Sequence, residues 1–302
     1  MQKSPKSGIA AVRPTTPLAL IKAMSATTVP AVAIAAVALV LLFRRFQKFR
    51  YIIRMIGLII AGLLSSTAGI VASPVMYLLG KPSSCNWVVA RTMRFLGPYF
   101  TGMNVVVEGK INQDNVPSVI VCNHQSSLDI ICMAAVIPQN VVVMAKREIK
   151  YVPVLGWFMA LANNVFIDRG NRTSAIETMA KVAVYLKAKK LSLWLFPEGT
   201  RSHQSDDSML SFKKGAFHLA VQGNIPVIPI VCSTYHPYYD KKNWSFEPGV
   251  VHMKVLDPIS TEGMKTADVD ALIEKTRAKM LEALKSIKTL PPTSLAKQGK
   301  VE

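Results

Sequence analysis

Two side chains that can act together as a general base lie in one short string of the sequence. His124 and Asp129 are five residues apart in NHQSSLD, residues 123–129, which directly follows the apolar run SVIVC. Residues three or four apart share a helix face, whereas residues five apart do not. The two side chains can meet if His124 precedes a helix and Asp129 lies in its first turns. A carboxylate on one imidazole nitrogen then fixes the tautomer, and the other nitrogen can accept a proton from a hydroxyl group.

A second string favours this catalytic interpretation over a simpler one, in which Asp129 caps a helix and His124 is structural. FPEGTR, residues 196–201, also follows an apolar run. Gly199 permits a close approach of the backbone, and Arg201 offers a planar fork of donors that suits a phosphate group. Glu198 can orient Arg201 or accept a hydrogen bond from a substrate hydroxyl.

The elements that must position these strings alternate between strands and helices from residue 101 onward, which predicts an α/β sandwich. An amphipathic last helix is expected to pack on the sheet, and the end of the chain is expected to be a disordered tail. Strands are predicted at 103–109, 118–122, 141–146, 164–169, 191–197, 226–231 and 250–256, and helices at 127–137, 173–190, 213–223 and 267–288.

The first hundred residues contain two long uncharged segments. Residues 24–43 can form a helix of roughly 30 Å, about the hydrocarbon thickness of a bilayer. A second run, 55–79, is interrupted by a Ser-Ser-Thr cluster and by Pro74, so it either crosses the bilayer or enters and returns. A removable targeting peptide is the alternative for the first segment. Residues 87–100 are too short to span, and their two arginines among large apolar residues suit an interfacial helix.

The distribution of charge indicates an anionic partner for this N-terminal region. All 18 Asp and Glu residues lie at Glu108 or later, whereas residues 1–107 carry 12 Lys and Arg, which leaves +12 there and 24 − 18 = +6 in the rest. A basic, apolar and acid-free segment favours anionic lipid head groups. Nucleic acid is disfavoured, since the basic residues flank apolar runs without an aromatic stripe. The four cysteines show no metal-ligand spacing and are expected to be buried thiols.

Taken together, the strings resemble the signature blocks of the 1-acyl-glycerol-3-phosphate acyltransferase family. NHQSSLD and FPEGTR are similar to its first and third blocks. VFIDRG, residues 165–170, is similar to the second block, and IPVIPIV, residues 225–231, to the fourth. The resemblance covers residues 100–290, and within the family it is greatest to fungal and bacterial members.

The resemblance implies a glycerolipid acyltransferase-type sandwich of a mixed sheet and helices, preceded by hydrophobic membrane helices. A basic tail (1–23), membrane-anchoring helices (24–100), the acyltransferase domain (101–290) and a disordered tail (291–302) are the expected parts. The implied reaction moves an acyl group from acyl-CoA to the sn-2 hydroxyl of lysophosphatidic acid. No bound cofactor and no metal are expected, because a thioester is already activated. The sequence has neither a GxSxG string nor a metal-ligand cluster, which speaks against an acyl-enzyme and favours direct transfer.

The resemblance also assigns roles to residues. His124 and Asp129 are implied as the catalytic pair, and Arg169 as a phosphate contact. The other substrate-binding candidates are Glu198, Gly199, Thr200 and Arg201, and the secondary candidates are Asn123, Lys146 and Lys213.

Several alternatives stay open at the level of sequence. The acceptor can be another lysophospholipid or glycerol-3-phosphate, and the chain can be an inactive membrane scaffold, although His124, Asp129 and Glu198 are all present. The expected partners are membrane lipids, lysophosphatidic acid and acyl-CoA, with no obligate protein partner. The expected location is an integral or monotopic site on the endoplasmic reticulum membrane, with the catalytic domain facing the cytosol.

Overall fold

The computed structural model describes residues 28–112, 116–168, 172–203, 206 and 208–287. The chain divides into two compact units, residues 1–49 and 50–302. The predicted tails, 1–23 and 291–302, lie outside the described residues. Within the first unit, helix α2 (Thr28–Arg45) agrees with the predicted helical segment and ends on two arginines.

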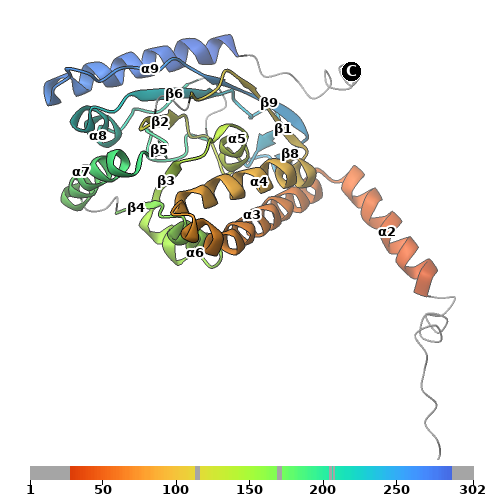
Figure 1. Cartoon of the computed structure of the whole chain (residues 1–302). Helices are drawn as coiled ribbons and strands as arrows, with labels where there is room; N and C mark the ends of the chain where they lie inside the picture. The colour runs from red at the N-terminus through yellow and green to blue at the C-terminus, as the bar shows by residue number, and fades with distance from the viewer. Residues whose placement is uncertain (1–27, 113–115, 169–171, 204–205, 207, 288–302) are drawn as a thin grey trace, which may run out of the picture. The chain divides into compact units, whose positions relative to one another are not determined.

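The second unit is built on a seven-stranded mixed sheet with the order β1-β9-β6-β2-β5-β3-β4 (Figure 1). β2 to β6 run parallel to one another, whereas β1 and β9 are parallel to each other and antiparallel to β6. Each predicted strand is present. The strands are β1 (Met103–Glu108), β2 (Val119–Cys122), β3 (Val141–Lys146), β4 (Val165–Ile167), β5 (Ser192–Leu195), β6 (Val227–Cys232) and β9 (Gly249–Val255).

Alternate residues of each central strand enter different cores, as the period of two requires. Val119 and Val121 of β2 join a core on one face of the sheet, and Ile120 and Cys122 join a core on the other. The first core is covered by α7 (Arg172–Lys189), α8 (Gly215–Gly223) and α9 (Val269–Ser286). The second is covered by α4 (Cys85–Thr101) and α5 (Asp129–Val136), and α6 (Leu155–Leu161) forms a smaller core beside it. Figure 1 shows these two helical layers on either side of the sheet.

Helix α3 (Gln47–Leu78) is continuous through the Ser-Ser-Thr cluster and Pro74, where a bend was one of the two alternatives that the sequence left open. Small side chains recur every four residues along its buried face, and this spacing places them in one row. Small residues allow two helix backbones to approach closely. A Cβ atom on Gly57 would meet Phe100 of α4 at 3.0 Å, which shows how close the packing is. The buried row consists of Gly57, Ala61, Ser65, Gly69 and Ser73.

Polar and aromatic contacts anchor the first turns of α3 to the β7–β8 hairpin (Tyr239–Asp240 and Ser245–Phe246). The buried Arg54 donates to the carbonyl oxygen of Phe246 and, at 3.1 Å, to the carboxylate of Glu247. Tyr51 stacks on Tyr239 with ring centroids 5.9 Å apart. A buried arginine needs such partners, because an unpaired charge in the protein interior is costly. These contacts join α3 to a loop region at the end of the β7–β8 hairpin.

The second compact unit begins at Arg50, so it includes α4 and nearly all of α3 together with the sheet. One face of α4 is buried through Ala90, Met93 and Gly97, and Arg91 and Arg94 donate to carbonyl oxygens at the end of α5. Among the described residues, α3 is the one helix found to be long and apolar enough to cross a membrane. Its outer face exposes many large apolar side chains, which supports association with a membrane.

The packing of α3 can be tested with two glycines of the same helix. We expect Gly69→Ala to destabilise the protein by about 1–3 kcal/mol, because its Cβ would lie 2.5 Å from Val89 and 2.8 Å from Phe158. Gly62→Ala is the control, since its Cβ would meet nothing within 4 Å. It should be neutral or stabilising by up to about 1 kcal/mol through helix propensity. Thermal unfolding of the full-length protein in a neutral detergent measures both. Equal behaviour of the two variants would contradict the docking of this face.

Candidate active site

The two polar strings meet at one edge of the sheet because the strands before them are adjacent and parallel. β2 pairs with β5, with Val121 opposite Leu195. His124 follows the end of β2, and Glu198 follows the end of β5. The carboxyl ends of parallel strands lie at the same edge, where the chain turns away from the sheet and leaves side chains free for a site.

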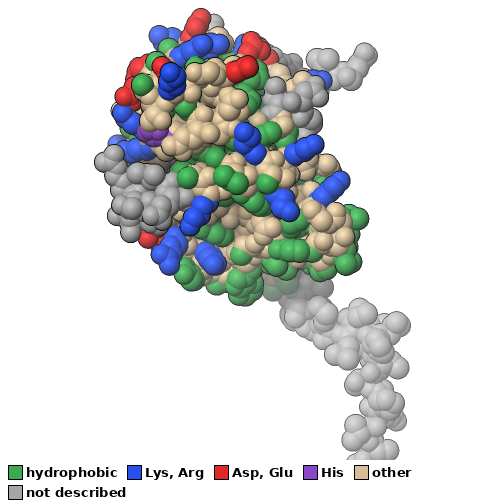
Figure 2. Space-filling view, turned by 60° about the vertical axis from the view of Figure 1, so that its left-hand side comes forward, with side chains coloured by type: hydrophobic (Ala, Val, Ile, Leu, Met, Phe, Trp, Pro, Cys, Tyr) green, Lys and Arg blue, Asp and Glu red, His purple; other side chains and the backbone are tan. Residues whose placement is uncertain are grey.

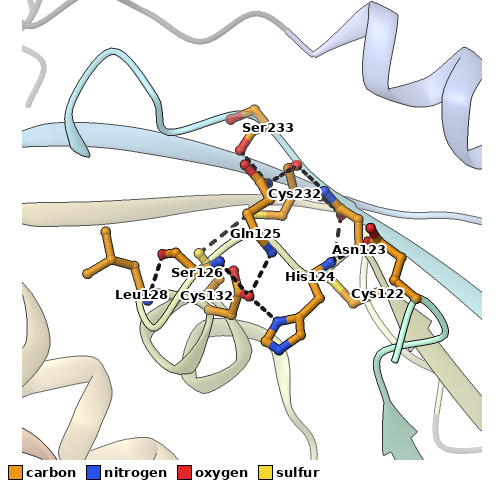
Figure 3. A network of polar contacts seen from close by, with 11 residues as sticks. Cys122, Asn123, His124, Gln125, Ser126, Leu128, Cys132, Cys232 and Ser233 are labelled. Atoms are coloured by element: carbon orange, nitrogen blue, oxygen red, sulfur yellow. Dashed lines mark hydrogen bonds and ion pairs between the residues drawn. The ribbon is translucent and has the colours of Figure 1, made fainter. Parts of the chain in front are cut away.

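His124 and Asp129 form a hydrogen-bonded pair. The Nδ1 atom of the imidazole contacts Oδ2 of Asp129, the first residue of α5 (Figure 3). The same oxygen accepts the backbone N–H groups of Gln125 (2.9 Å) and Ser126 (3.2 Å). Burial raises the pKa of the Asp129 carboxyl, and the contact with His124 opposes that rise. No hydrogen bond within the described chain engages Nε2 of His124, so this nitrogen is available to a substrate.

Glu198 joins the two loops through its own carboxylate. Its side chain is buried, and Oε1 accepts the backbone N–H of His124 at 2.7 Å while Oε2 accepts that of Leu210 at 3.0 Å. Burial raises the pKa of the Glu198 carboxyl, and these two N–H groups oppose the rise because they favour the ionised form. Glu198 therefore holds the backbone of His124 in place. The sequence suggested that Glu198 could orient Arg201, but no ion pair between them is present in the described residues.

Asn123 and Gln125 fasten the catalytic loop to the end of β6. Asn123 exchanges two hydrogen bonds with the backbone of Cys232, at 2.9 and 2.8 Å. The Gln125 amide donates to the carbonyl oxygens of Cys232 (2.9 Å) and Ser233 (3.0 Å). Figure 3 shows the side chains of Asn123 and Gln125 directed toward Cys232. Both side chains are buried, so Asn123, a candidate substrate contact from the sequence, here has a structural role.

The imidazole of His124 also stacks on an aromatic ring. Its centroid lies 4.0 Å from that of Phe196, with an interplanar angle of 14°. Backbone bonds from Ser202 and His203 to the carbonyl oxygens of His124 (2.8 Å) and Gln125 (3.2 Å) add further links between the loops. The ring is therefore held by a hydrogen bond at one nitrogen and by packing on one face, which limits its rotation.

The remaining residues of the second string form the turn beyond Glu198. Gly199 has φ +73°, a conformation that favours glycine. Thr200 and Arg201 are exposed, and no ion pair or hydrogen bond engages the Arg201 guanidinium within the described residues. The charge of Arg201 opposes the rise that burial causes in the pKa of Tyr239, which places this arginine on the side of the hairpin that contacts α3.

The other substrate-binding candidates from the sequence are Lys213, Lys146 and Arg169. The exposed Lys213 lies beside the turn, since a Cβ on Gly199 would meet its side chain at 3.2 Å, and its N–H donates to Pro197 at 2.7 Å. Lys146 is exposed and pairs with Glu148 at 2.9 Å. Arg169 lies outside the described residues. In the part of the chain that the structure describes, no three metal-ligating side chains converge on one point.

Sequence reasoning missed the positioning residues more than the reactive ones. The role of Glu198 depends on two N–H groups that come from different loops, and the stacking of Phe196 depends on the pairing of β2 with β5. Of these positioning residues, only Gln125 could have been inferred from the sequence. It follows directly on an apolar strand, and a buried amide there needs hydrogen-bond partners.

A substitution that changes a single atom of the carboxylate tests the positioning role of Glu198. Glu198→Gln leaves one acceptor for two N–H groups, so we expect a loss of about 1–3 kcal/mol in stability. Displacement of His124 should lower kcat by about tenfold to a hundredfold. Thermal unfolding and steady-state acyl transfer measure the two effects, with the exposed Glu282→Gln of α9 as control. Unchanged stability with a raised KM for the acceptor would instead make Glu198 a substrate contact.

Comparisons with known proteins agree with this geometry. Residues 104–233 match the family model described as Acyltransferase. The chain is 40% identical over 235 residues to the 1-acyl-sn-glycerol-3-phosphate acyltransferase of Saccharomyces cerevisiae, covering 75% of this chain and 78% of the yeast protein.

A human relative and a bacterial crystal structure extend the comparison. The human alpha enzyme of the same name is 41% identical over 221 residues, covering 73% of this chain and 77% of that protein. The crystal structure of the 1-acyl-sn-glycerophosphate acyltransferase of Thermotoga maritima has the same fold, with a TM-score of 0.53 and 24% identity over 77% of this chain and all of that one. This chain belongs to the 1-acyl-sn-glycerol-3-phosphate acyltransferase family.

Proposed function

We propose that the protein transfers an acyl group from acyl-CoA to the sn-2 hydroxyl of lysophosphatidic acid, which gives phosphatidic acid and free CoA. The observation that carries the proposal is the His124–Asp129 pair, which is held at the sheet edge with Nε2 of His124 available. The 40% identity to the yeast 1-acyl-sn-glycerol-3-phosphate acyltransferase supports the choice of acceptor.

His124 acts as general base in this scheme. Its Nε2 takes the proton of the sn-2 hydroxyl as the oxygen attacks the thioester carbonyl carbon. The C–S bond then breaks, and the CoA thiolate leaves and receives the proton from the imidazolium. Asp129 fixes the tautomer and stabilises the imidazolium between these two steps. Since the thioester is already activated, the transfer needs neither a metal nor a bound cofactor.

Arg201 contacts the phosphate of the acceptor in this proposal. It is exposed on the turn that follows Glu198 and lacks a protein partner among the described residues. A guanidinium binds a phosphate through two parallel hydrogen bonds. Gly199 and Thr200 form the turn that presents it, and Lys213 lies next to that turn. Arg169 is proposed as a second phosphate contact on the resemblance of VFIDRG to a family block. Lys146 stays a secondary candidate.

The membrane supplies the acceptor and receives the product. The exposed apolar side chains of α3 support an integral or monotopic attachment. Acyl-CoA is soluble, so the site should face the cytosol, and in a eukaryotic cell the endoplasmic reticulum is the proposed membrane. Asn243 begins an Asn-Trp-Ser glycosylation sequon, so carbohydrate on Asn243 in active enzyme would contradict this orientation.

The acceptor is tested by offering purified full-length protein oleoyl-CoA together with a panel of acceptors. Lysophosphatidic acid should be used well ahead of glycerol-3-phosphate, lysophosphatidylcholine and monoacylglycerol, with products separated by head group. Arg201→Lys should raise the KM for lysophosphatidic acid by about tenfold or more and change that for acyl-CoA little, since an ammonium lacks the planar fork. If the enzyme preferred another acceptor, it would be an acyltransferase of the same superfamily with a different substrate.

The catalytic role is tested by His124→Ala in the same assay. Loss of a positioned general base should lower kcat by about 10²–10⁴-fold with an unchanged melting temperature. The control is His218→Ala in α8, a histidine that lies outside the site. A folded His124→Ala enzyme with more than a tenth of the wild-type rate would refute the assignment.

A further inference from the structure

A cavity of about 370 Å³ lies at the edge of the sheet opposite the catalytic pair. Asn140 precedes β3, and Lys190 and Leu191 precede β5, so these lining residues stand at the amino ends of parallel strands. His124 and Glu198 follow the carboxyl ends of β2 and β5. The cavity is therefore separate from the site described above. Its other wall is the turn of residues 80–83 between α3 and α4.

The lining is cationic and rich in hydrogen-bond donors. Lys81, Lys189 and Lys190 contribute three ammonium groups from two distant parts of the chain. No Asp or Glu is among the lining residues, and none of the three lysines has an ion pair within the described chain. Lys189 ends α7, where a cation also suits the helix dipole. The same reason covers Lys190, the residue after the helix end, but not Lys81, which lies in another part of the chain.

The exposed Asn163 lines the cavity, and its Oδ1 accepts a hydrogen bond from the hydroxyl of Tyr77 at 3.4 Å. Tyr185 is another lining residue. The backbone at Asn163 is left-handed, with φ 54°, as it is at Lys190, with φ 51°. Asparagine adopts this conformation readily and lysine uncommonly. Two tight turns thus set the positions of an amide and an ammonium group in the lining.

The end of α3 connects the cavity with an apolar surface. Leu78 and Leu79 are 88% and 62% exposed, and the cavity lining begins at the next residue, Gly80. On the face in Figure 2, Lys and Arg side chains lie over the middle next to a hydrophobic region below, and acidic side chains gather at the top. A ligand with a phosphate and long apolar chains matches both parts, since the phosphate can enter the cavity while the chains follow the leucines.

We propose that this cavity binds the phosphate of an anionic two-chain phospholipid, at a site distinct from the one that binds the substrates. Ammonium groups attract anionic head groups, and the amide and hydroxyl groups can donate hydrogen bonds to phosphate oxygens. The site does not depend on the proposed reaction. A bilayer lipid held there would orient the catalytic unit through the connection of Lys81 to α3.

Binding is tested with dioctanoyl phosphatidylglycerol, whose phosphodiester is neither the acceptor nor the product of the proposed reaction. It is titrated into full-length protein in an uncharged detergent and followed by calorimetry. The triple variant Lys81→Gln, Lys189→Gln, Lys190→Gln should bind at least about tenfold more weakly. The matched control removes three exposed lysines from α9 (Lys275→Gln, Lys279→Gln, Lys285→Gln) and should bind within about twofold of wild type. Dioctanoyl phosphatidylcholine tests the need for net negative charge and should not compete.

Two single variants and an exchange measurement locate the bound lipid. Asn163→Asp introduces a carboxylate into the lining and should weaken binding in the same way, while His124→Ala should bind as wild type. Hydrogen exchange of residues 80–83 and 186–191 should slow on binding, which places the lipid at the cavity. Equal losses in the triple variant and its control, or undiminished binding by the triple variant, would overturn the proposal. Displacement by inorganic phosphate at the concentration of the lipid would assign the cavity to free phosphate instead.

Discussion

Glu198 is buried at the end of β5, and its two oxygens accept N–H groups from residues that lie 74 and 12 positions away in the chain. This carboxylate fixes the backbone of His124 relative to the turn that carries Arg201. Two hydrogen bonds to a charged acceptor are needed there, because a buried carboxylate without partners is costly. The negative charges of Glu198 and Asp129 repel each other. Backbone N–H groups that donate to both carboxylates offset part of this repulsion. Glu198 thus positions the proposed catalytic histidine through the backbone.

The loops held by Glu198 are stable only because the strands beneath them are fixed in register. β2 lies between β5 and β6, and Asn123 and Gln125 reach across to the end of β6 while Glu198 reaches back from β5. His124 is therefore braced from both neighbouring strands. Its ring is further confined by Phe196, so the imidazole is presented in one orientation. A general base that is already held in one orientation does not have to lose rotational entropy when the transition state forms.

Helix α3 shows how one segment can serve both the fold and a membrane. Its row of small residues packs on α4 and α6, and Arg54 binds the hairpin that carries Tyr239. Its other face exposes large aliphatic side chains. Because the inner face packs through small side chains and the outer face is apolar, the helix can lie against the catalytic unit and still contact lipid. The candidate site and the apolar outer face of α3 then belong to one compact unit, which suits an enzyme whose acceptor and product are lipids.

The sequence by itself predicted the seven strands of the main sheet, four of the five α-helices that follow residue 101 and the family, and it singled out His124 and Asp129 as a candidate pair; it did not predict α6. Those inferences rest on local periodicity and on short strings, and both survive without knowledge of long-range contacts. Only the tertiary structure decided that Glu198 and Asn123 position the loop, that the compact unit starts at Arg50 and that three lysines line one cavity. The hydrogen-bond partner of a buried polar group depends on which segments the fold brings near it. In the same way, the row of small residues in α3 does not by itself show whether it faces lipid or protein. Burial and pairing between distant segments are properties of the packed chain, so residue type and spacing alone do not define them.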